Sequence, residues 1–406
     1  MTDQTDCIIV GGGIGGSVLA LSLGKKGRNV LVLEREIKTP TTVGRPEILS
    51  SFTLAFFKQL GMSEKILSDA AEPLSGLKLS HPKKGLLLEL TPEDFKRNHV
   101  QPYTTDPARM RAILMEQACQ QPTVQLQHGV EVTQLIKKGS QVIGVRAMAE
   151  GKEVEYRASL VVGDDGGRSR IRQELGIALT AKEFPVLFVA AGGPTLPELK
   201  NKIGQAWLNP CRINQGIFGG IFMPIPGNRS ALVFLMKQKT YDRYKNNPAL
   251  FYQEAKNLSP LCDPLEKYFS FPTQFGLFHR PFGHAATYVA DGAALMGDAA
   301  HPVTPAGGQG ANASISDAMA LAQVTDAALK EKNFSAKRLS EYETLRRLAN
   351  TRSLQFSVRG NQALNLLQLF PWLGIFAPAL LRRVNNTPHL KNNFIQTVSR
   401  TFLSYP

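Results

Sequence analysis

The chain has 406 residues, of which 43% are hydrophobic, and a formal net charge of +14. This length and composition can bury a large core and predict two closely joined domains. Lys and Arg are spread along the chain without a nucleic-acid-binding motif, so we expect no nucleic-acid partner. A solvated basic surface explains the charge most simply, and attraction to an anionic membrane or substrate is the alternative.

The N-terminus, the cysteines and the hydropathy pattern favour a cytoplasmic protein. The first residues lack the basic stretch of a signal peptide, and no apolar run reaches about 18 residues, so we expect no transmembrane helix. The four cysteines are scattered without metal-ligand spacing: Cys7, Cys119, Cys211 and Cys262. They fit a reducing compartment and predict neither a metal site nor a dithiol pair.

The first predicted elements form a dinucleotide-binding unit. An apolar strand at 7–10 is followed by the glycines of residues 11–16 and by a predicted helix. In this G-x-G-x-x-G spacing Gly11 permits a tight turn, Gly13 lets the backbone approach a pyrophosphate, and Gly16 allows close packing of helix on strand.

An acid and two arginines follow this unit. The strand at 29–33 ends in Glu34, at the distance expected for a residue that binds a ribose, and an acid there favours NAD or FAD over NADP. Arg35 either contacts the adenine or is solvated. Arg45, before a predicted helix at 51–60, either meets the cofactor or forms a surface ion pair.

The middle of the chain predicts strands around one further turn. Residues 77–90 predict a hairpin and 107–119 a helix, and the strands at 124–126, 130–136, 142–147 and 154–156 are expected to form an inserted meander. A buried strand at 160–163 leads into a sharp turn, which Asp165 faces, and Ser169 is expected to cap the next helix. Residues 177–288 shift to alternating strands, which predict a mostly antiparallel second sheet.

A late glycine-rich turn organises the chain. A short strand at 294–296 breaks into Gly297-Asp298-Ala299-Ala300-His301, and a helix is predicted from Ala311. Such a turn presents free backbone N–H groups and the positive end of a helix dipole. The Asp298 carboxylate suits the hydroxyls of a sugar or polyol, whereas His301 is expected to be structural.

Two C-terminal segments are predicted to be helical. Residues 335–354 form a charged amphipathic pattern, and residues 361–383 are apolar with a cationic end, interrupted at Pro371 and Pro378. The second segment either docks on the body of the protein or touches a membrane surface.

Three motifs in this order resemble the single-component (group A) FAD-dependent aromatic monooxygenases of the para-hydroxybenzoate hydroxylase type. They are the fingerprint at 11–16 with Glu34, the turn from Asp165-Gly166 through Ser169 to Arg172, and the segment from Gly297 to Asn312. The resemblance implies an α/β fold: a Rossmann-like FAD-binding domain (1–176 and 281–335), an inserted, mostly antiparallel β-sheet substrate domain (177–280) and a helical C-terminal region (336–406).

The resemblance also implies the roles of the site residues. Gly13, Ile14 and Gly15 would serve the pyrophosphate of FAD, Glu34 its adenosine ribose and Asp298 its ribitol, with Ala311 and Asn312 beneath the flavin ring. Arg111 would replace an arginine that the family often has where this chain has Pro107. The predicted cofactor-binding residues are Gly11, Gly13, Ile14, Gly15, Glu34, Arg35, Arg45, Arg111, Asp165, Asp298, Gly310, Ala311 and Asn312, and Pro305, Gly307 and Gly308 would position flavin and substrate.

The reaction implied is hydroxylation of an electron-rich aromatic, phenolic or quinone-type substrate through a flavin C4a-hydroperoxide, without a protein nucleophile. A single dinucleotide fingerprint implies that NAD(P)H visits the flavin transiently before O2 reacts. Two alternatives stay open: a flavin-dependent reductase of isoprenoid double bonds, and a flavin-binding protein without turnover. A lipophilic substrate and peripheral membrane contact of the C-terminal region are compatible with this reading.

Overall fold

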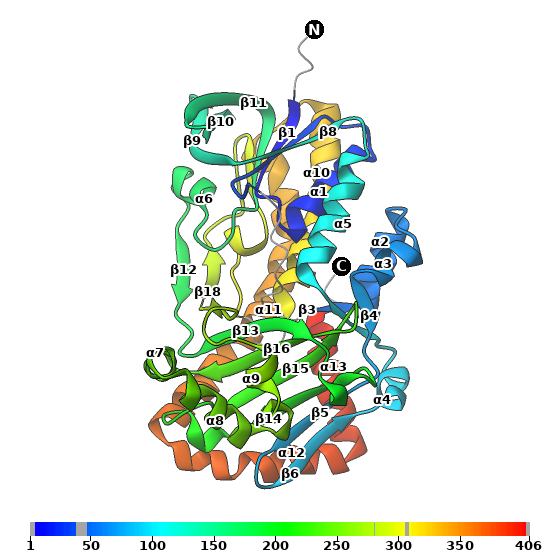
Figure 1. Cartoon of the computed structure of the whole chain (residues 1–406). Helices are drawn as coiled ribbons and strands as arrows, with labels where there is room; N and C mark the ends of the chain where they lie inside the picture. The colour runs from blue at the N-terminus through cyan, green and yellow to red at the C-terminus, as the bar shows by residue number, and fades with distance from the viewer. Residues whose placement is uncertain (1–4, 38–46, 280, 305–307, 403–406) are drawn as a thin grey trace.

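The computed structural model describes residues 5–37, 47–279, 281–304 and 308–402, without the side chains of residues 356 and 398–402. Two large sheets organise it, one in the upper and one in the lower half of Figure 1. Long helices near the C-terminus accompany both. This arrangement confirms the predicted α/β class, the mostly antiparallel second sheet and the helical C-terminal region.

The first sheet has a parallel centre built on β1 (Thr5–Val10). β1 pairs in parallel with β2 (Val30–Glu34) on one side and β11 (Lys152–Gly163) on the other. The full strand order is β19 (Val289–Ala290), β20 (Ala293–Leu295), β11, β1, β2 and β8 (Val124–His128), and β10 (Gln141–Ala149) and β9 (Val130–Lys138) extend from β11. β2 and the second half of β1 are buried apolar runs, as expected for parallel strands whose sheet is covered by helices. Among these helices, α1 (Ile14–Gly24) packs on α5 (Pro107–Cys119) and α10 (Gln309–Glu331).

Two strand predictions in this region were wrong. The strand expected at 124–126 is not in the meander, because β8 pairs in parallel with β2. The segments at 154–156 and 160–163 are parts of one strand, β11. The first half of β11 is exposed and polar where it pairs with β10, and the second half is apolar where it pairs with β1. The change in hydropathy along one strand was therefore mistaken for a break.

The second sheet has seven strands. Its order is β17 (Gly276–Phe278), β13 (Leu187–Pro194), β16 (Arg229–Met236), β15 (Gly219–Ile225), β14 (Ile203–Leu208), β5 (Gly76–His81) and β6 (Gly85–Leu90). All neighbours are antiparallel except β14 and β5. The predicted hairpin at 77–90 is confirmed as β5 and β6. It is hydrogen-bonded into this sheet, although it lies within the range 1–176 that was grouped with the FAD-binding domain.

Shorter elements connect the two sheets. β3 (Glu47–Ser50), β7 (Pro102–Thr105) and β4 (Ala71–Pro73) form one small sheet, and β12 (Leu179–Lys182) and β18 (Phe282–Ala285) form another. The other helices before the C-terminal region are α2 (Ser51–Gln59), α3 (Glu64–Ser68), α4 (Pro92–Arg97), α6 (Arg170–Glu174), α7 (Gln238–Asn246), α8 (Pro248–Leu258) and α9 (Leu265–Tyr268), with 3-10 turns η1 (Pro197–Leu199), η2 (Pro210–Arg212) and η3 (Pro260–Cys262).

The C-terminal region folds back on the second sheet. α11 (Ala336–Leu369) extends past the predicted end at 354 and stops before Pro371, which begins η5 (Pro371–Ile375). Pro378 does not break a helix, because it lies in the first turn of α12 (Ala377–Asn386), where proline is tolerated. α13 (Pro388–Phe402) follows.

Side chains of this region hold it to the body of the protein. Lys391 pairs with Asp94 of α4 at 2.5 Å, and Asn385 Oδ1 accepts from the Glu89 N–H of β6 at 2.9 Å. In the described ranges no single helix is long and apolar enough to cross a membrane; α11 and the segment 371–386 meet that test only together, with a bend of 113° between them.

Candidate active site

The glycine loop joins β1 directly to α1. Gly11 has a φ of 106°, which favours glycine. A Cβ on Gly16 would lie 2.2 Å from the Gly11 carbonyl oxygen, so the close approach of helix and strand requires glycine there. α1 begins after Gly13 without a side-chain cap or an acidic residue in its first turn. The start of α1 suits an anion, and the Asp164 carboxylate already accepts from the Gly16 N–H there.

Glu34 and Arg111 brace this loop. Glu34 is 7% exposed, and its Oε2 accepts from the Gly12 N–H at 2.9 Å and from Arg111 Nη2 at 2.7 Å. Arg111 Nε also donates to the Gly12 carbonyl oxygen. Glu34 and Arg111, each predicted separately to contact the cofactor, thus meet beside the fingerprint. The Arg35 side chain, in contrast, is 74% exposed and lies 4.0 Å from Glu36, while Arg45 falls outside the described residues.

Two consecutive acids, Asp164 and Asp165, follow β11 and make different contacts. Asp165 Oδ2 accepts from the N–H groups of Arg170 and Ile171 at 2.6 and 3.1 Å, so it caps α6. Ser169 caps the same helix, as predicted, by accepting from the Arg172 N–H at 2.9 Å. It is Asp164 that borders the cavity described below.

Asp164 is a site residue that the sequence analysis missed. Its Oδ2 accepts from the Gly16 N–H at 2.7 Å. Burial, together with the charges of Asp298, Asp165 and Asp317, raises the pKa of Asp164 well above its ordinary value despite that hydrogen bond. Two consecutive acids after a strand were the available signal, but spacing alone could not tell which one faces inward.

A buried polar network around Asp317 holds the turn at residues 297–301 in place. Gly297–Ala299 form a 3-10 turn, η4. Asp317 of α10 accepts from the Gly297 N–H at 3.0 Å, from Arg346 Nε at 2.9 Å and from Asn350 Nδ2 at 3.0 Å, and it is bonded to His301 Nε2. Burial alone would raise the pKa of Asp317, but His301 and Arg346 hold it well below its ordinary value. This network fits the expected structural role of His301.

The start of α10 faces the same cavity. Gly308, which precedes the helix, has a φ of 63°, and the helix has no side-chain cap and no acid in its first turn. Asn312 does not border the cavity among the described lining residues. Its Oδ1 accepts from the Ser50 N–H at 3.2 Å and from Thr53 Oγ1 at 2.9 Å, and its Nδ2 donates to the Ile48 carbonyl oxygen at 2.7 Å. Pro305 and Gly307 fall outside the described residues.

One cavity, whose empty volume is about 1660 Å³ including open solvent at its mouth, brings these parts together. From the predicted set it is lined by Gly13, Ile14, Gly15, Asp298, Gly308, Gly310 and Ala311. Its other wall is apolar and comes from the second sheet: Phe188, Ile221, Met223, Val233 and Phe278. The cavity thus has a polar half, which suits a nucleotide, and an apolar half that faces it.

The polar half fits FAD. The starts of α1 and α10 face one cavity. Neither N-cap residue has a capping side chain, although Asp164 Oδ2 accepts from the Gly16 N–H in the first turn of α1. Such helix starts stabilise a pyrophosphate and negative charge on a ring. Asp298 lines the same cavity, and its carboxylate can accept from polyol hydroxyls. In the described ranges no group of His, Cys, Asp and Glu side chains could hold a metal ion.

Comparisons with known proteins agree with this geometry. Residues 4–357 match the family described as FAD binding domain. The chain is 27% identical over 354 residues to the ubiquinone hydroxylase UbiL of Rhodospirillum rubrum (85% of this chain, 78% of that protein). It is 26% identical over 356 residues to digeranylgeranylglycerophospholipid reductase 1 of Methanococcoides burtonii (84% and 79%).

A solved structure supports the fold. The p-nitrophenol 4-monooxygenase PnpA of Pseudomonas putida superimposes with a TM-score of 0.81 at 19% identity and covers 98% of both chains. With the family match, this confirms the predicted FAD cofactor and the Rossmann-like FAD-binding fold. The chain belongs to the family of single-component FAD-dependent aromatic monooxygenases and is an FAD-dependent oxidoreductase.

Proposed function

We propose that this enzyme uses NAD(P)H and O2 to hydroxylate an electron-rich aromatic, phenolic or quinone-type substrate. The observation that supports the proposal is the single cavity in which Asp298 and the start of α10 face apolar side chains of the second sheet. An aromatic ring held against Phe188, Met223 and Val233 would lie opposite the cofactor half and displace water from it. FAD, when bound, supplies the redox and oxygen-transfer chemistry expected from the resemblance.

We propose specific roles for the residues around the cavity. Gly13, Ile14 and Gly15 would receive the pyrophosphate at the start of α1, and Asp298 would accept from the ribitol hydroxyls. Glu34 would accept from the adenosine ribose while Arg111 keeps the acid in place. The dipole of α10, at Gly310 and Ala311, would stabilise negative charge on the reduced ring.

Replacement of Asp298 by Ala tests the cofactor roles. The variant should fold but bind FAD at least tenfold more weakly, because a charge-assisted hydrogen bond contributes about 1.5–3 kcal/mol. FAD affinity is measured by titrating the apoprotein. An unchanged affinity would remove Asp298 from the cofactor site.

The reaction is tested by following flavin reduction anaerobically with NADH and NADPH, alone and with a panel of phenols, quinone precursors and polycyclic aromatics. We expect one class of compound to accelerate bleaching, and admission of O2 then to yield a hydroxylated product. A flavin that neither nucleotide bleaches with any compound would refute the proposed nucleotide step and favour a binding protein without turnover.

A second candidate is the reduction of isoprenoid double bonds. It is favoured by the similarity to the archaeal reductase, whose identity to this chain is close to that of the hydroxylase. The two reactions differ in how the reduced flavin is reoxidised. Under anaerobic conditions an unsaturated isoprenoid reoxidises the flavin only if the enzyme is a reductase.

We also propose a cytoplasmic location, which the four unpaired cysteines favour, with peripheral membrane contact near η5. Large apolar side chains are exposed there on Leu369, Trp372, Ile375, Phe376 and Leu380. They are followed in the sequence by the exposed cations Arg382 and Arg383. Such a combination suits an anionic membrane surface.

A further inference from the structure

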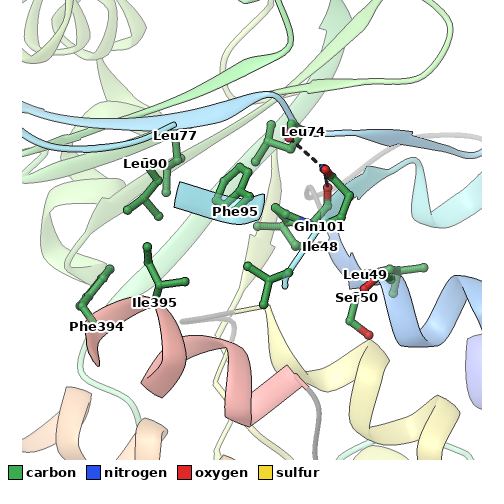
Figure 2. A pocket seen from close by; sticks show the side chains of 13 residues that line it. Ile48, Leu49, Ser50, Leu74, Leu77, Leu90, Phe95, Gln101, Phe394 and Ile395 are labelled. Carbon is green, nitrogen blue, oxygen red and sulfur yellow. Dashed lines mark hydrogen bonds between the residues drawn. The ribbon is translucent and has the colours of Figure 1, made fainter. Parts of the chain in front are cut away.

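A second cavity, whose empty volume is about 700 Å³ including open solvent at its mouth, lies between β3, the β5–β6 hairpin, α4 and α13 (Figure 2). All thirteen residues that line it are apolar except Ser50, Ser51 and Gln101. The Gln101 amide nitrogen is satisfied by the protein, since Nε2 donates to the Leu74 and Pro102 carbonyl oxygens at 3.0 and 2.9 Å. None of these lining residues is ionisable. We name this cavity the side chamber.

The side chamber adjoins the candidate active site. Ile48 and Leu77 line both cavities, so the two are separated by little more than these side chains. The position of Ile48 is fixed from the cofactor side, because Asn312 at the start of α10 bonds its carbonyl oxygen. In Figure 2 Phe394 and Ile395 of α13 lie at one end of the chamber and Leu49 and Ser50 at the other, with Ile48 between them.

The lining determines what the side chamber can hold. Ordered water needs two to four polar partners, which an apolar cavity does not offer, whereas hydrocarbon gains free energy from every methylene group that it buries there. A charged or sugar-like group would lose its hydration without compensation. Ile395 is 3% exposed and Phe394 is 36% exposed, so the far end approaches the surface.

We propose that the substrate is an aromatic ring with an aliphatic chain, and that the side chamber binds the chain while the ring lies in the active-site cavity. This inference rests on the proposed hydroxylation for the position of the ring. The chain passes from the ring between Ile48 and Leu77 and runs along Leu90 and Phe95 toward α13. Chains longer than the chamber extend past Phe394.

The test measures binding of 4-methylphenol, 4-hexylphenol and 4-decylphenol to the FAD-loaded protein by calorimetry, and hydroxylated product separately. Affinity should rise about three- to fourfold for each added methylene group until the chamber is full. Leu90→Trp fills the chamber from β6 and should lower the hexyl-to-methyl affinity ratio at least tenfold. Ile395→Trp does the same from α13 and serves if the first variant misfolds.

Leu86→Trp is the matched control. Leu86 lies on the same strand as Leu90, but it is 42% exposed and does not line the chamber. Its variant should keep the wild-type affinity ratio. An affinity that does not depend on chain length, or an equal loss of the ratio in both β6 variants, would overturn the inference. A chain-length effect that only the chamber variants abolish, without hydroxylated product, would support the chamber and count against the proposed reaction.

Discussion

Replacement of Asp317 by asparagine perturbs the network that supports the late turn. Asp317 is 0% and Arg346 1% exposed as side chains, so the pair is almost fully desolvated. Breaking a buried pair from one side costs about 3–5 kcal/mol, because the other charge loses its partner carboxylate inside the protein. The total free energy of unfolding of a domain is about 5–15 kcal/mol, so this loss should be easy to detect.

Urea unfolding of the FAD-loaded protein measures the effect. Asp326→Asn is the matched control, because Asp326 lies on the same helix and its side chain is 12% exposed, while its partners Arg28 and Lys330 are 23% and 67% exposed. Their better access to water should make the loss smaller than for Asp317. The double variant Asp317→Asn/Arg346→Met should lose less than the two single variants together. Equal losses in the Asp317 and Asp326 variants, or strictly additive losses, would refute the reasoning.

Three further predictions follow from other parts of the molecule. Asp164→Asn keeps the acceptor for the Gly16 N–H but removes a disfavoured charge. The urea midpoint of the variant apoprotein should therefore be higher than that of wild type at pH 8, and the difference between the two midpoints should narrow toward pH 5. A lower midpoint for the variant at pH 8 would contradict this. Burial, with the charges of His301 and Arg347, lowers the pKa of His284 to about 4 from an ordinary 6.5, so the unfolded state binds a proton first and stability should fall between about pH 6.5 and 4. Thermal unfolding should show a shallower fall for His284→Gln, and identical pH profiles would exclude His284 as the cause. Trp372→Ser/Phe376→Ser should reduce co-sedimentation with anionic vesicles several-fold relative to Leu277→Ser, an exposed apolar position on β17, and equal binding of both variants would argue against membrane contact at η5.

The backbone motifs could be predicted because they are local. The glycine fingerprint needs Gly11 at a positive φ and Gly16 where a Cβ would collide with Gly11, so few other residues fit. The Ser169 cap and the hairpin at 77–90 likewise depend on neighbours in sequence. Each of these features is determined by residues that are close together in the sequence.

The parts that could not be predicted depend on tertiary contacts. The choice of Asp164 over Asp165 as the acid facing the cavity is made by the approach of Gly16, far away in sequence. The Asn312 amide is hydrogen-bonded to residues of β3 and α2, and nothing in the glycine-rich motif around Asn312 indicates these bonds. The side chamber exists because α13 packs near the hairpin, and the membership of that hairpin in the second sheet arises from its pairing with β14.

The most direct test of the central claim is the fate of molecular oxygen. The FAD-loaded protein is supplied with NAD(P)H, the phenol or quinone precursor that best accelerates flavin reduction, and isotopically labelled O2, and the product is examined by mass spectrometry. The account predicts one labelled oxygen atom in each molecule of hydroxylated product. An unlabelled product, or hydrogen peroxide as the only product of oxygen with every substrate class, would contradict it.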